Sequence, residues 1–403
     1  MRMNHLTRIC AVFAAVGACC SALAQQGPGW QFYREVNRDA LPIVPAGFEV
    51  SFFAREPLVR QPCSMAFDAK GRLCVGMGPQ YRNPKPNTPG DSVVLVLDSD
   101  GDGKADRTKT FATGFYSIQG LTWHGRDLWV ANAPDLTVVR DLDGDDEADE
   151  YVRVFTDLGN LEHGLHGLNW APDGKLYMSK GNSKGLNTAE RHAPKPFREL
   201  FGLPTPPGAK DFPEPQTFKP ADYRHAYQDP DDDWGYMGGL LRCDDGGRNL
   251  EIVVRGLRNP WDITFDSGFN WLGTDNDQNE GDRVFSPFFG AHFGWNHPWS
   301  TSWSGAGNLP TTPVSAPVFH GSGTGIICKR APNPMVPGSG FPGRMTGSIG
   351  GPVGRLGQAA LGFQFAGSSS WRSAVIAVGM RRRTSSNHLA GSSPYRRAVI
   401  NRL

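Results

Sequence analysis

The feature that most constrains this chain is a repeated pair of short apolar strands joined by a glycine or aspartate turn. The pair recurs as PCSMAFDAKGRLCVGM, IQGLTWHGRDLWVANA, HGLNWAPDGKLYMSKG and NPWDITFDSGFNWLGTD, which start at residues 62, 118, 166 and 259. Its aromatic anchors, Phe67, Trp123, Trp170 and Phe265, follow a period of about 48 residues, and the last gap covers two periods. This period predicts the blades of a β-propeller, whereas a β-sandwich would need no repeat.

Composition agrees with a fold built from strands and turns. The 403 residues include 50 glycines and 32 prolines, which is too many turn formers for a mainly helical protein. The chain is also long enough to bury a large hydrophobic core. The sequence therefore predicts an all-β protein.

The first residues have the layout of a secretory signal. A basic start precedes the apolar run Ile9–Ala18, and small residues follow it. We therefore expect a signal peptide over residues 1–24, cleaved after Ala24, and export to the periplasm or the cell exterior. We expect no membrane span, because the run is too short and no later stretch approaches about 18 apolar residues. Lipidation at Cys19 is the alternative.

Charge is distributed unevenly along the chain, although the formal net charge is only +1. Residues 329–403 contain ten arginines and one lysine but no acidic residue, so all 40 acidic residues precede them. A segment of this composition is poorly suited to completing a folded blade. We predict that residues 329–403 form a basic tail, which is either disordered or read in a non-native frame. The near-neutral total gives no reason to expect a nucleic-acid partner.

Two acidic loops of the same design follow apolar strands and are candidate calcium sites. Carboxylates occupy positions 1, 3, 5 and 9 of each loop, a spacing that can wrap oxygen ligands around Ca²⁺. They are Asp98, Asp100, Asp102 and Asp106 in the first loop and Asp141, Asp143, Asp145 and Asp149 in the second. Position 6 is Gly103 in the first loop but Asp146 in the second, which weakens the second prediction because glycine permits the tight turn. The alternative is two solvated acidic turns.

A long proline-rich insertion, residues 187–233, interrupts the repeat. Its prolines predict that it holds no regular strands. On one face of a propeller, such an insertion serves either as a lid over the central pocket or as decoration, and the sequence does not decide between them.

The densest polar chemistry lies within Val253–Trp299. Arg258 and Asn259 form a turn between two apolar strands there, and a turn on a rigid sheet is a good place for a ligand. The strings GLRNPWDITFD, NEGDRV and GAHFGWNHP, in this order, resemble the G-x-R-N-P, G-D-E and G-N-Y-G-W-P series of the soluble quinoprotein glucose/sorbosone dehydrogenases. They are closer still to a group of large secreted proteins named membrane-bound dehydrogenases, which often carry a cytochrome c domain.

The resemblance covers residues 41–328 and implies both a fold and a site. The implied fold is a six-bladed β-propeller that is incomplete in this chain, with a truncated or frameshifted C-terminal part. His163 falls where those enzymes carry their catalytic histidine, and Glu162 falls where they carry an acid. A histidine beside a carboxylate at a strand entry can act as a general base. Arg258 would steady the charge that develops on the cofactor.

The implied cofactors are pyrroloquinoline quinone (PQQ) and Ca²⁺. Contacts with the cofactor would come from Gln119, His166, Asn259 and Asp282. Two residues depart from the pattern of the related enzymes. His166 replaces a glycine, and Arg283 replaces the acid that usually follows Asp282.

Three functional classes remain open from the sequence. The first is a secreted dehydrogenase that oxidises a small carbohydrate or alcohol and passes electrons to a cytochrome c partner, or an inactive truncated form of it. Because the chain has no C-x-x-C-H motif, it holds no covalent haem of its own. The second is a calcium-dependent, lactonase-type hydrolase, which would need several carboxylates converging on the propeller axis. The third is a non-catalytic propeller that binds glycans or proteins.

Overall fold

The computed structural model describes residues 41, 48–81, 86–156, 158, 163–182, 214–223, 238–266, 268–276, 282–295, 327–328, 345–346, 374–380 and 397–402. The chain divides into two compact units, Met1–Ile43 and Val44–Leu403, and the assigned strands belong to the second unit. The expected signal peptide lies outside the described residues. Within the described ranges, no helix has the length and apolar content of a membrane span.

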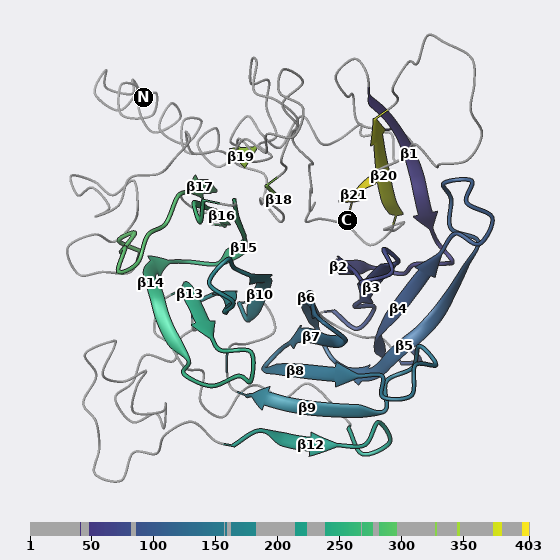
Figure 1. The fold of residues 1–403 in the computed structure, drawn as a ribbon, viewed down its shortest axis with the longest axis horizontal. Coiled ribbons are helices and arrows are strands. Elements are labelled where there is room, and N and C mark those ends of the chain that lie inside the picture. The colour runs from purple at the N-terminus through teal and green to yellow at the C-terminus, as the bar shows by residue number, and fades with distance from the viewer. Residues whose placement is uncertain are drawn as a thin grey trace, which may run out of the picture. The chain divides into compact units, whose positions relative to one another are not determined.

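Four antiparallel sheets follow one another along the chain (Figure 1). The first contains β2 (Pro62–Phe67), β3 (Leu73–Met77), β4 (Asp91–Leu97) and β5 (Arg107–Phe115). The second contains β6 (Ile118–His124), β7 (Asp127–Asn132), β8 (Asp135–Arg140) and β9 (Glu150–Phe155). The third contains β10 (Leu165–Trp170), β11 (Leu176–Lys180), β13 (Gly238–Cys243) and β14 (Glu251–Leu257). The fourth contains β15 (Pro260–Phe265), β16 (Trp271–Asp275) and β17 (Arg283–Phe285).

Neighbouring sheets meet through their first strands. Strand β6 lies against β2 and β10, and β10 also lies against β15. Each first strand opens one of the predicted hairpins, and consecutive antiparallel sheets that pack in this way are propeller blades. The all-β propeller prediction is therefore confirmed. The described residues form four such blades and no helix, so the expected number of six is not reached within them.

Apolar side chains fill the spaces between neighbouring blades. Between the third and fourth blades, the Tyr177 ring lies edge-on to Phe265 and Trp271, with centroids 5.0 and 5.1 Å away. Burying a large apolar side chain contributes about 1.5–3 kcal/mol, so these contacts hold the blades at a fixed spacing. Among the predicted aromatic anchors, Trp123, Trp170 and Phe265 pack against the buried clusters, whereas Phe67 is 46% exposed and lies outside the core.

Each first strand carries a β-bulge close to its start. The strand pairing gains one extra residue after Pro62, Ile118, Leu165 and Pro260. The residues on the bulges are Cys63 in β2, Gln119 in β6, His166 with Gly167 in β10, and Trp261 in β15. A bulge re-aims a side chain, and bulges are over-represented next to active sites. The repeat therefore includes a backbone irregularity that the apolar pattern does not reveal.

The proline-rich insertion contributes a strand, so the expectation that it holds none is wrong. Strand β12 (Gln216–Phe218) pairs with β9 and extends the second sheet to five strands (Figure 1). The three residues contain no proline, and they lie between Pro215 and Pro220 on an outer edge, where prolines are tolerated. Tyr223 then anchors the insertion, because its buried hydroxyl lies 3.0 Å from Asn132 Nδ2 and 2.8 Å from Thr137 Oγ1.

Five more strand segments include three from the basic tail. Strand β1 (Phe48–Arg55) pairs with β20 (Ala374–Met380), which pairs with β21 (Arg397–Arg402). Strand β18 (Ile327–Cys328) pairs with β19 (Met345–Thr346). The sequence did not predict strands in the tail. Its assignment to a non-native reading frame stays a prediction.

Candidate functional site

Two of the three residues predicted to be catalytic, His163 and Arg258, occupy equivalent positions in different blades. His163 lies two residues before β10, and Arg258 lies two residues before β15. Because β10 packs beside β15, these two entry turns are neighbours. A backbone hydrogen bond joins their surroundings, since the N–H of Asn182 donates to the carbonyl oxygen of Arg258 at 2.7 Å. The structure thus brings together two residues that are far apart in the sequence.

Asn182 fixes the orientation of the His163 imidazole. Nδ1 of His163 lies 2.6 Å from Oδ1 of Asn182, and both side chains are buried. Because an amide oxygen only accepts, Nδ1–H donates and the basic lone pair is on Nε2. Sequence reasoning missed Asn182. The available signal was a polar residue at or just after the end of the second strand of a repeat, which recurs as Asn132 and Asp275.

His163 is neutral at physiological pH. Burial, the largest cause, and the Arg258 guanidinium lower its pKa to about 4, although the hydrogen bond to Asn182 opposes the shift. Lys180, at the end of β11, is a smaller cause of the lowered pKa. A neutral imidazole with its lone pair on Nε2 can accept a proton, so the turn supplies a general base across the neutral range.

A buried carboxylate holds the backbone of the Arg258–Asn259 turn. The N–H of Asn259 donates to Asp275 Oδ1 at 2.8 Å, and the N–H of Arg258 donates to Asp275 Oδ2 at 3.2 Å. The Arg258 guanidinium donates from Nη1 to the carbonyl oxygen of Asn276 at 3.1 Å. Charged hydrogen bonds of this kind are stronger than neutral ones. The turn is therefore fixed before any ligand binds.

The Asp282–Arg283 step does not resemble a calcium-binding loop. Arg283 is 0% exposed, and its Nη2 lies 3.4 Å from Asp275 Oδ2 while its guanidinium carbon lies 5.2 Å from the centre of the Phe293 ring. Asp282 is also buried, but it belongs to neither of the acidic clusters found among the described residues. A fixed guanidinium beside the turn opposes a divalent cation there. The predicted role of Asp282 in a cation site gains no support.

His166 and Gln119, both predicted to contact the cofactor, lie on the bulges of β10 and β6. Nε2 of His166 is 2.8 Å from Asn259 Oδ1, and the imidazole is stacked on Trp261 with ring centroids 4.0 Å apart. Burial lowers the pKa of His166 to about 3, so this imidazole is neutral as well. Gln119 is buried and donates from Nε2 to Ser117 Oγ at 3.0 Å. Glu162 lies outside the described residues.

Two glycines are needed for this close packing. A Cβ on Gly181 would collide with Asn259 Oδ1 and would stand 2.7 Å from His163 Cβ. A Cβ on Gly120 would collide with the carbonyl oxygen of His166. Real side chains essentially never approach so closely, so only glycine lets the blades bring His163, His166 and Asn259 together.

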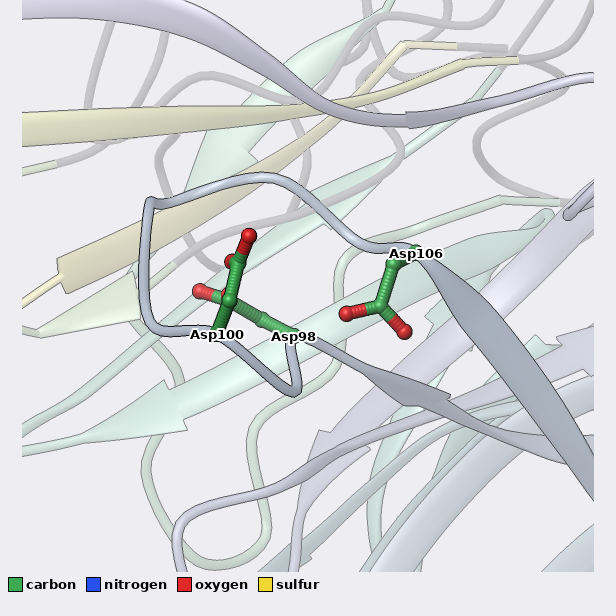
Figure 2. A group of neighbouring side chains, drawn as sticks. All are labelled: Asp98, Asp100 and Asp106. Atoms are coloured by element: carbon green, nitrogen blue, oxygen red, sulfur yellow. The ribbon is translucent and has the colours of Figure 1, made fainter.

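The first acidic loop joins β4 to β5 and has its carboxylates turned inward. Figure 2 shows Asp98 and Asp100 on one limb of the loop and Asp106 on the other, with their oxygens gathered between the limbs. One oxygen from each of these residues lies within 4.8 Å of the others. Asp102 is not part of the cluster, and its Oδ1 accepts the N–H of Lys104 at 2.7 Å. Three carboxylates at this spacing can ligate Ca²⁺.

The second loop joins β8 to β9 and repeats this geometry. Asp141, Asp143 and Asp149 place one oxygen each within 4.8 Å of the others, and Asp145 accepts the N–H of Glu147 at 2.8 Å. The doubt raised by Asp146 is removed, because its φ is 69°, in the same left-handed region as Gly103 at 97°. The tight turn therefore forms without glycine.

Comparisons with known proteins give one family model and a set of solved structures. The family is described as Domain of unknown function (DUF7133), and it matches residues 40–199. No curated protein matches the chain.

Three of the similar solved structures are sugar-oxidising enzymes. The PQQ-bound aldose sugar dehydrogenase from Streptomyces coelicolor is 15% identical, with a TM-score of 0.41 over 66% of this chain and 72% of that chain. The holo PQQ domain of a pyranose dehydrogenase from Coprinopsis cinerea is 14% identical, with a TM-score of 0.41 over 63% and 58%. The apo soluble aldose sugar dehydrogenase from Escherichia coli is 13% identical, with a TM-score of 0.39 over 63% and 67%. At these identities and TM-scores, the similarity does not assign a site or an activity to this chain.

Proposed function

We propose that this chain is a propeller of the quinoprotein dehydrogenase type, which oxidises a hydroxyl group of a small sugar or alcohol. The observation that carries the proposal is the buried, neutral His163 beside the Arg258 guanidinium. Because His163 is neutral, its imidazole can accept a proton at neutral pH, and the fixed cation beside it can stabilise negative charge that develops nearby. The motif resemblance in the sequence independently suggests the same pair of residues.

The residues at the entry turns fit PQQ. Arg258 and Asn259 would hold it, because a guanidinium and an amide suit carboxylate and quinone oxygens, and the buried cation of Arg283 adds to the positive field. When bound, PQQ supplies an acceptor for the hydride of the substrate. Among the described residues, the carboxylates near Arg258 do not form an acidic cluster like those of the two loops, and we propose no calcium ion at this point.

His163, Asn182 and Arg258 have separate roles in the proposed reaction. His163 accepts the proton of the substrate hydroxyl at Nε2, while its Nδ1–H stays bonded to Asn182. Arg258 stabilises the negative charge, and its position is set by Asp275 through the backbone. Burial of His163 and Asn182 excludes water from their contact, which strengthens the electrostatic interaction between them.

Substitution of His163 and Arg258 tests the proposal. His163→Ala should lower dye-linked turnover with PQQ and a hexose by about 10² to 10⁴, the range for a lost general base. Arg258→Ala should cost roughly 3 to 4 kcal/mol of transition-state stabilisation. The double variant should lose much less than the sum, because both residues serve one transition state. His124→Ala is the control and should do little. Full activity in His163→Ala, or equal damage from the control, contradicts the proposal.

The pH dependence of the wild type offers a second test. Because the pKa of His163 is lowered to about 4, the base stays unprotonated until the pH falls to that value. The acid limb of kcat/KM should therefore lie near pH 4 rather than near 6.5, the ordinary value for histidine. A limb that stays at 6.5 would remove His163 from the role of base.

The proposal also covers the number of blades, the export of the protein, its electron acceptor and its calcium ions. We propose that the full ring has six blades, that the protein is exported to the periplasm or beyond, and that a cytochrome c accepts its electrons. We also propose that Ca²⁺ binds the acidic loops and stabilises the blades that carry them, without taking part in proton transfer. Electron transfer to added cytochrome c, measured by the change in its absorbance, tests the partner.

A further inference from the structure

Lys180 is a buried cation beside the candidate site that the proposed reaction does not use. It is the last residue of β11, it pairs with Leu165 in β10 and Gly239 in β13, and it is only 2% exposed. Lysine is rarely buried so completely, because removing an ammonium group from water costs free energy. The charge at this position therefore needs a reason.

The rest of this face of β11 is apolar. Side chains alternate between the two faces of a strand, so Leu176, Met178 and Lys180 share one face. Leu176 and Met178 are 0% exposed and belong to a buried apolar cluster, which an apolar residue at position 180 would continue. The strand then leads into Gly181, on which a Cβ would stand 2.7 Å from His163 Cβ. The apolar pattern thus breaks at the end of the strand that lies beside His163.

The ammonium group binds a backbone oxygen. Nζ of Lys180 donates to the carbonyl oxygen of Gly181 at 2.9 Å. That carbonyl belongs to the same planar peptide unit as the N–H of Asn182, which donates to the carbonyl oxygen of Arg258 at 2.7 Å. The Gly181–Asn182 peptide is therefore held at both ends, by Lys180 in the third blade and by the entry turn of the fourth.

This peptide carries the residue that orients His163. Because Gly181 has no Cβ, its backbone is conformationally permissive. Its N–H donates to the carbonyl oxygen of Gly164 at 3.0 Å, which fixes the peptide before Gly181 but not the one after it. Asn182 Oδ1 accepts the Nδ1–H of His163 at 2.6 Å. A rotation of the Gly181–Asn182 peptide would therefore move the amide that holds the imidazole.

We propose that Lys180 is a positioning residue, whose ammonium group holds the Gly181–Asn182 peptide and thereby keeps Nε2 of His163 in the orientation that accepts the substrate proton. The proposal rests on the proposed function and adds a residue that supports its general base. Lys180 acts through Asn182 and not on the substrate. Its charge also acts on the imidazole, since it lowers the pKa of His163 after the larger effects of burial and the Arg258 guanidinium.

Two substitutions separate the ammonium group from the space that it fills. Lys180→Met and Lys180→Leu both remove the charged donor and continue the apolar face of the strand, but they differ in shape. An effect common to both therefore comes from the lost ammonium group. Lys175→Met is the matched control, because Lys175 precedes the other end of β11 and its Nζ contacts Asp244 at 2.5 Å.

The first measurement uses the protein alone. Proton NMR with nitrogen-15-labelled histidine should show the Nδ1–H of His163 at pH 7. Its exchange with water should be about tenfold faster in both Lys180 variants, as expected when a buried hydrogen bond from a charged group is lost, and unchanged in Lys175→Met. A wild-type exchange rate in either Lys180 variant that is folded by circular dichroism overturns the proposal, and so does equal acceleration in the control.

The second measurement is dye-linked turnover with PQQ and a hexose. Lys180→Met should lower kcat about tenfold and change KM by less than about twofold, because the base is misplaced while the substrate contacts remain. In an Asn182→Ala background, the same substitution should lower kcat by less than about twofold, because the residue through which Lys180 acts is already gone.

The combined variant distinguishes positioning from a general structural role. Losses that multiply in Lys180→Met with Asn182→Ala would show that Lys180 acts independently of Asn182, which overturns the proposal. If the wild type shows no turnover with PQQ, the proposed function fails, and the NMR exchange rates still decide the role of Lys180.

Discussion

The two acidic loops share one backbone but differ in what holds them. In each, the first aspartate accepts two backbone N–H groups, as Asp98 does from Gly101 and Gly103 at 2.8 and 3.0 Å. Asp141 does the same for Gly144 and Asp146 at 2.6 and 3.0 Å.

Only in the second loop does position 6 carry a side chain. Asp146 receives two hydrogen bonds from Arg72 in the first blade, at 2.6 and 2.7 Å, and Lys70 lies 3.6 Å away. Gly103, at the same position of the first loop, cannot make such a contact. The difference shows that a neighbouring blade stabilises position 6 of one loop through an ion pair that the glycine of the other loop cannot make. The first loop should therefore depend more strongly on calcium.

Calcium binding should have the largest effect on stability, and this effect should differ between the two loops. At about 100 times its Kd, Ca²⁺ should stabilise the protein by about 2.7 kcal/mol, and Asp98→Asn should remove more of that shift than Asp141→Asn. Differential scanning calorimetry in millimolar Ca²⁺ and in chelator measures both. An unchanged melting temperature in the wild type would exclude structural calcium, and equal losses in the two variants would erase the difference between the loops.

Substitution of Gly103 tests the turn itself. Its φ of 97° is unfavourable for any residue with a Cβ, so Gly103→Ala should destabilise the protein by about 1–2 kcal/mol. Asp146→Gly should relieve the corresponding strain at 69° while losing the ion pair, and its net effect should be smaller. Urea unfolding of the two variants gives the values. A larger loss in Asp146→Gly would mean that the ion pair outweighs the backbone.

Removal of Arg72 breaks the link between the blades. Arg72→Ala should destabilise the protein by about 1 kcal/mol, because the pair is bidentate but partly exposed. The hydrogen bonds from Arg72 lower the pKa of Asp146 to about 2, below its ordinary value of 3.8.

The sign of the pH effect follows from that lowered pKa. The stabilisation is complete above pH 3.8 and is lost as the pH falls toward 2, because the unfolded chain binds the proton more readily in this window. Unfolding measured at pH 7, 4 and 2.5 should show this loss in the wild type and a weaker one in Arg72→Ala. Identical pH profiles would contradict the assignment.

Lys109 should contribute least. It contacts the carbonyl oxygen of Asp145, and its Nζ lies 3.4 Å from Glu147, whose side chain is 64% exposed. Lys109→Ala should therefore change the free energy of unfolding by about 0.5 kcal/mol or less, and added salt should reduce the effect. Urea unfolding at low and high salt measures this. A loss as large as that of Arg72→Ala would show that the two cations hold the loop jointly.

The repeat made much of the fold predictable, because apolar pairs around tight turns specify hairpins and their order specifies blades. It also placed His163 and Arg258 at corresponding positions, since both precede a first strand. Asn182 was not predictable in the same way, because a single polar residue after a strand can have many ordinary structural roles. Its role depends on a 2.6 Å contact that only the packing of two turns creates.

Other features depended on tertiary contacts as well. The ion pair of Arg72 with Asp146 joins residues from different blades, and no local sequence pattern predicts it. Strand β12 was missed because prolines around it argued against regular structure, although the three residues between them were free to pair with an edge. The bulges were missed because one extra residue leaves the apolar pattern almost unchanged.

The bulges have a consequence for how such a protein can change over evolutionary time. Cys63, Gln119, His166 and Trp261 differ in size and chemistry, yet the strands that carry them pair in the same manner. The extra residue is therefore a position whose identity can drift without disturbing the inherited hairpin. When a blade is duplicated, the copy already contains such a position. Ligand recognition can therefore change in one blade while the pairing of the strands is retained.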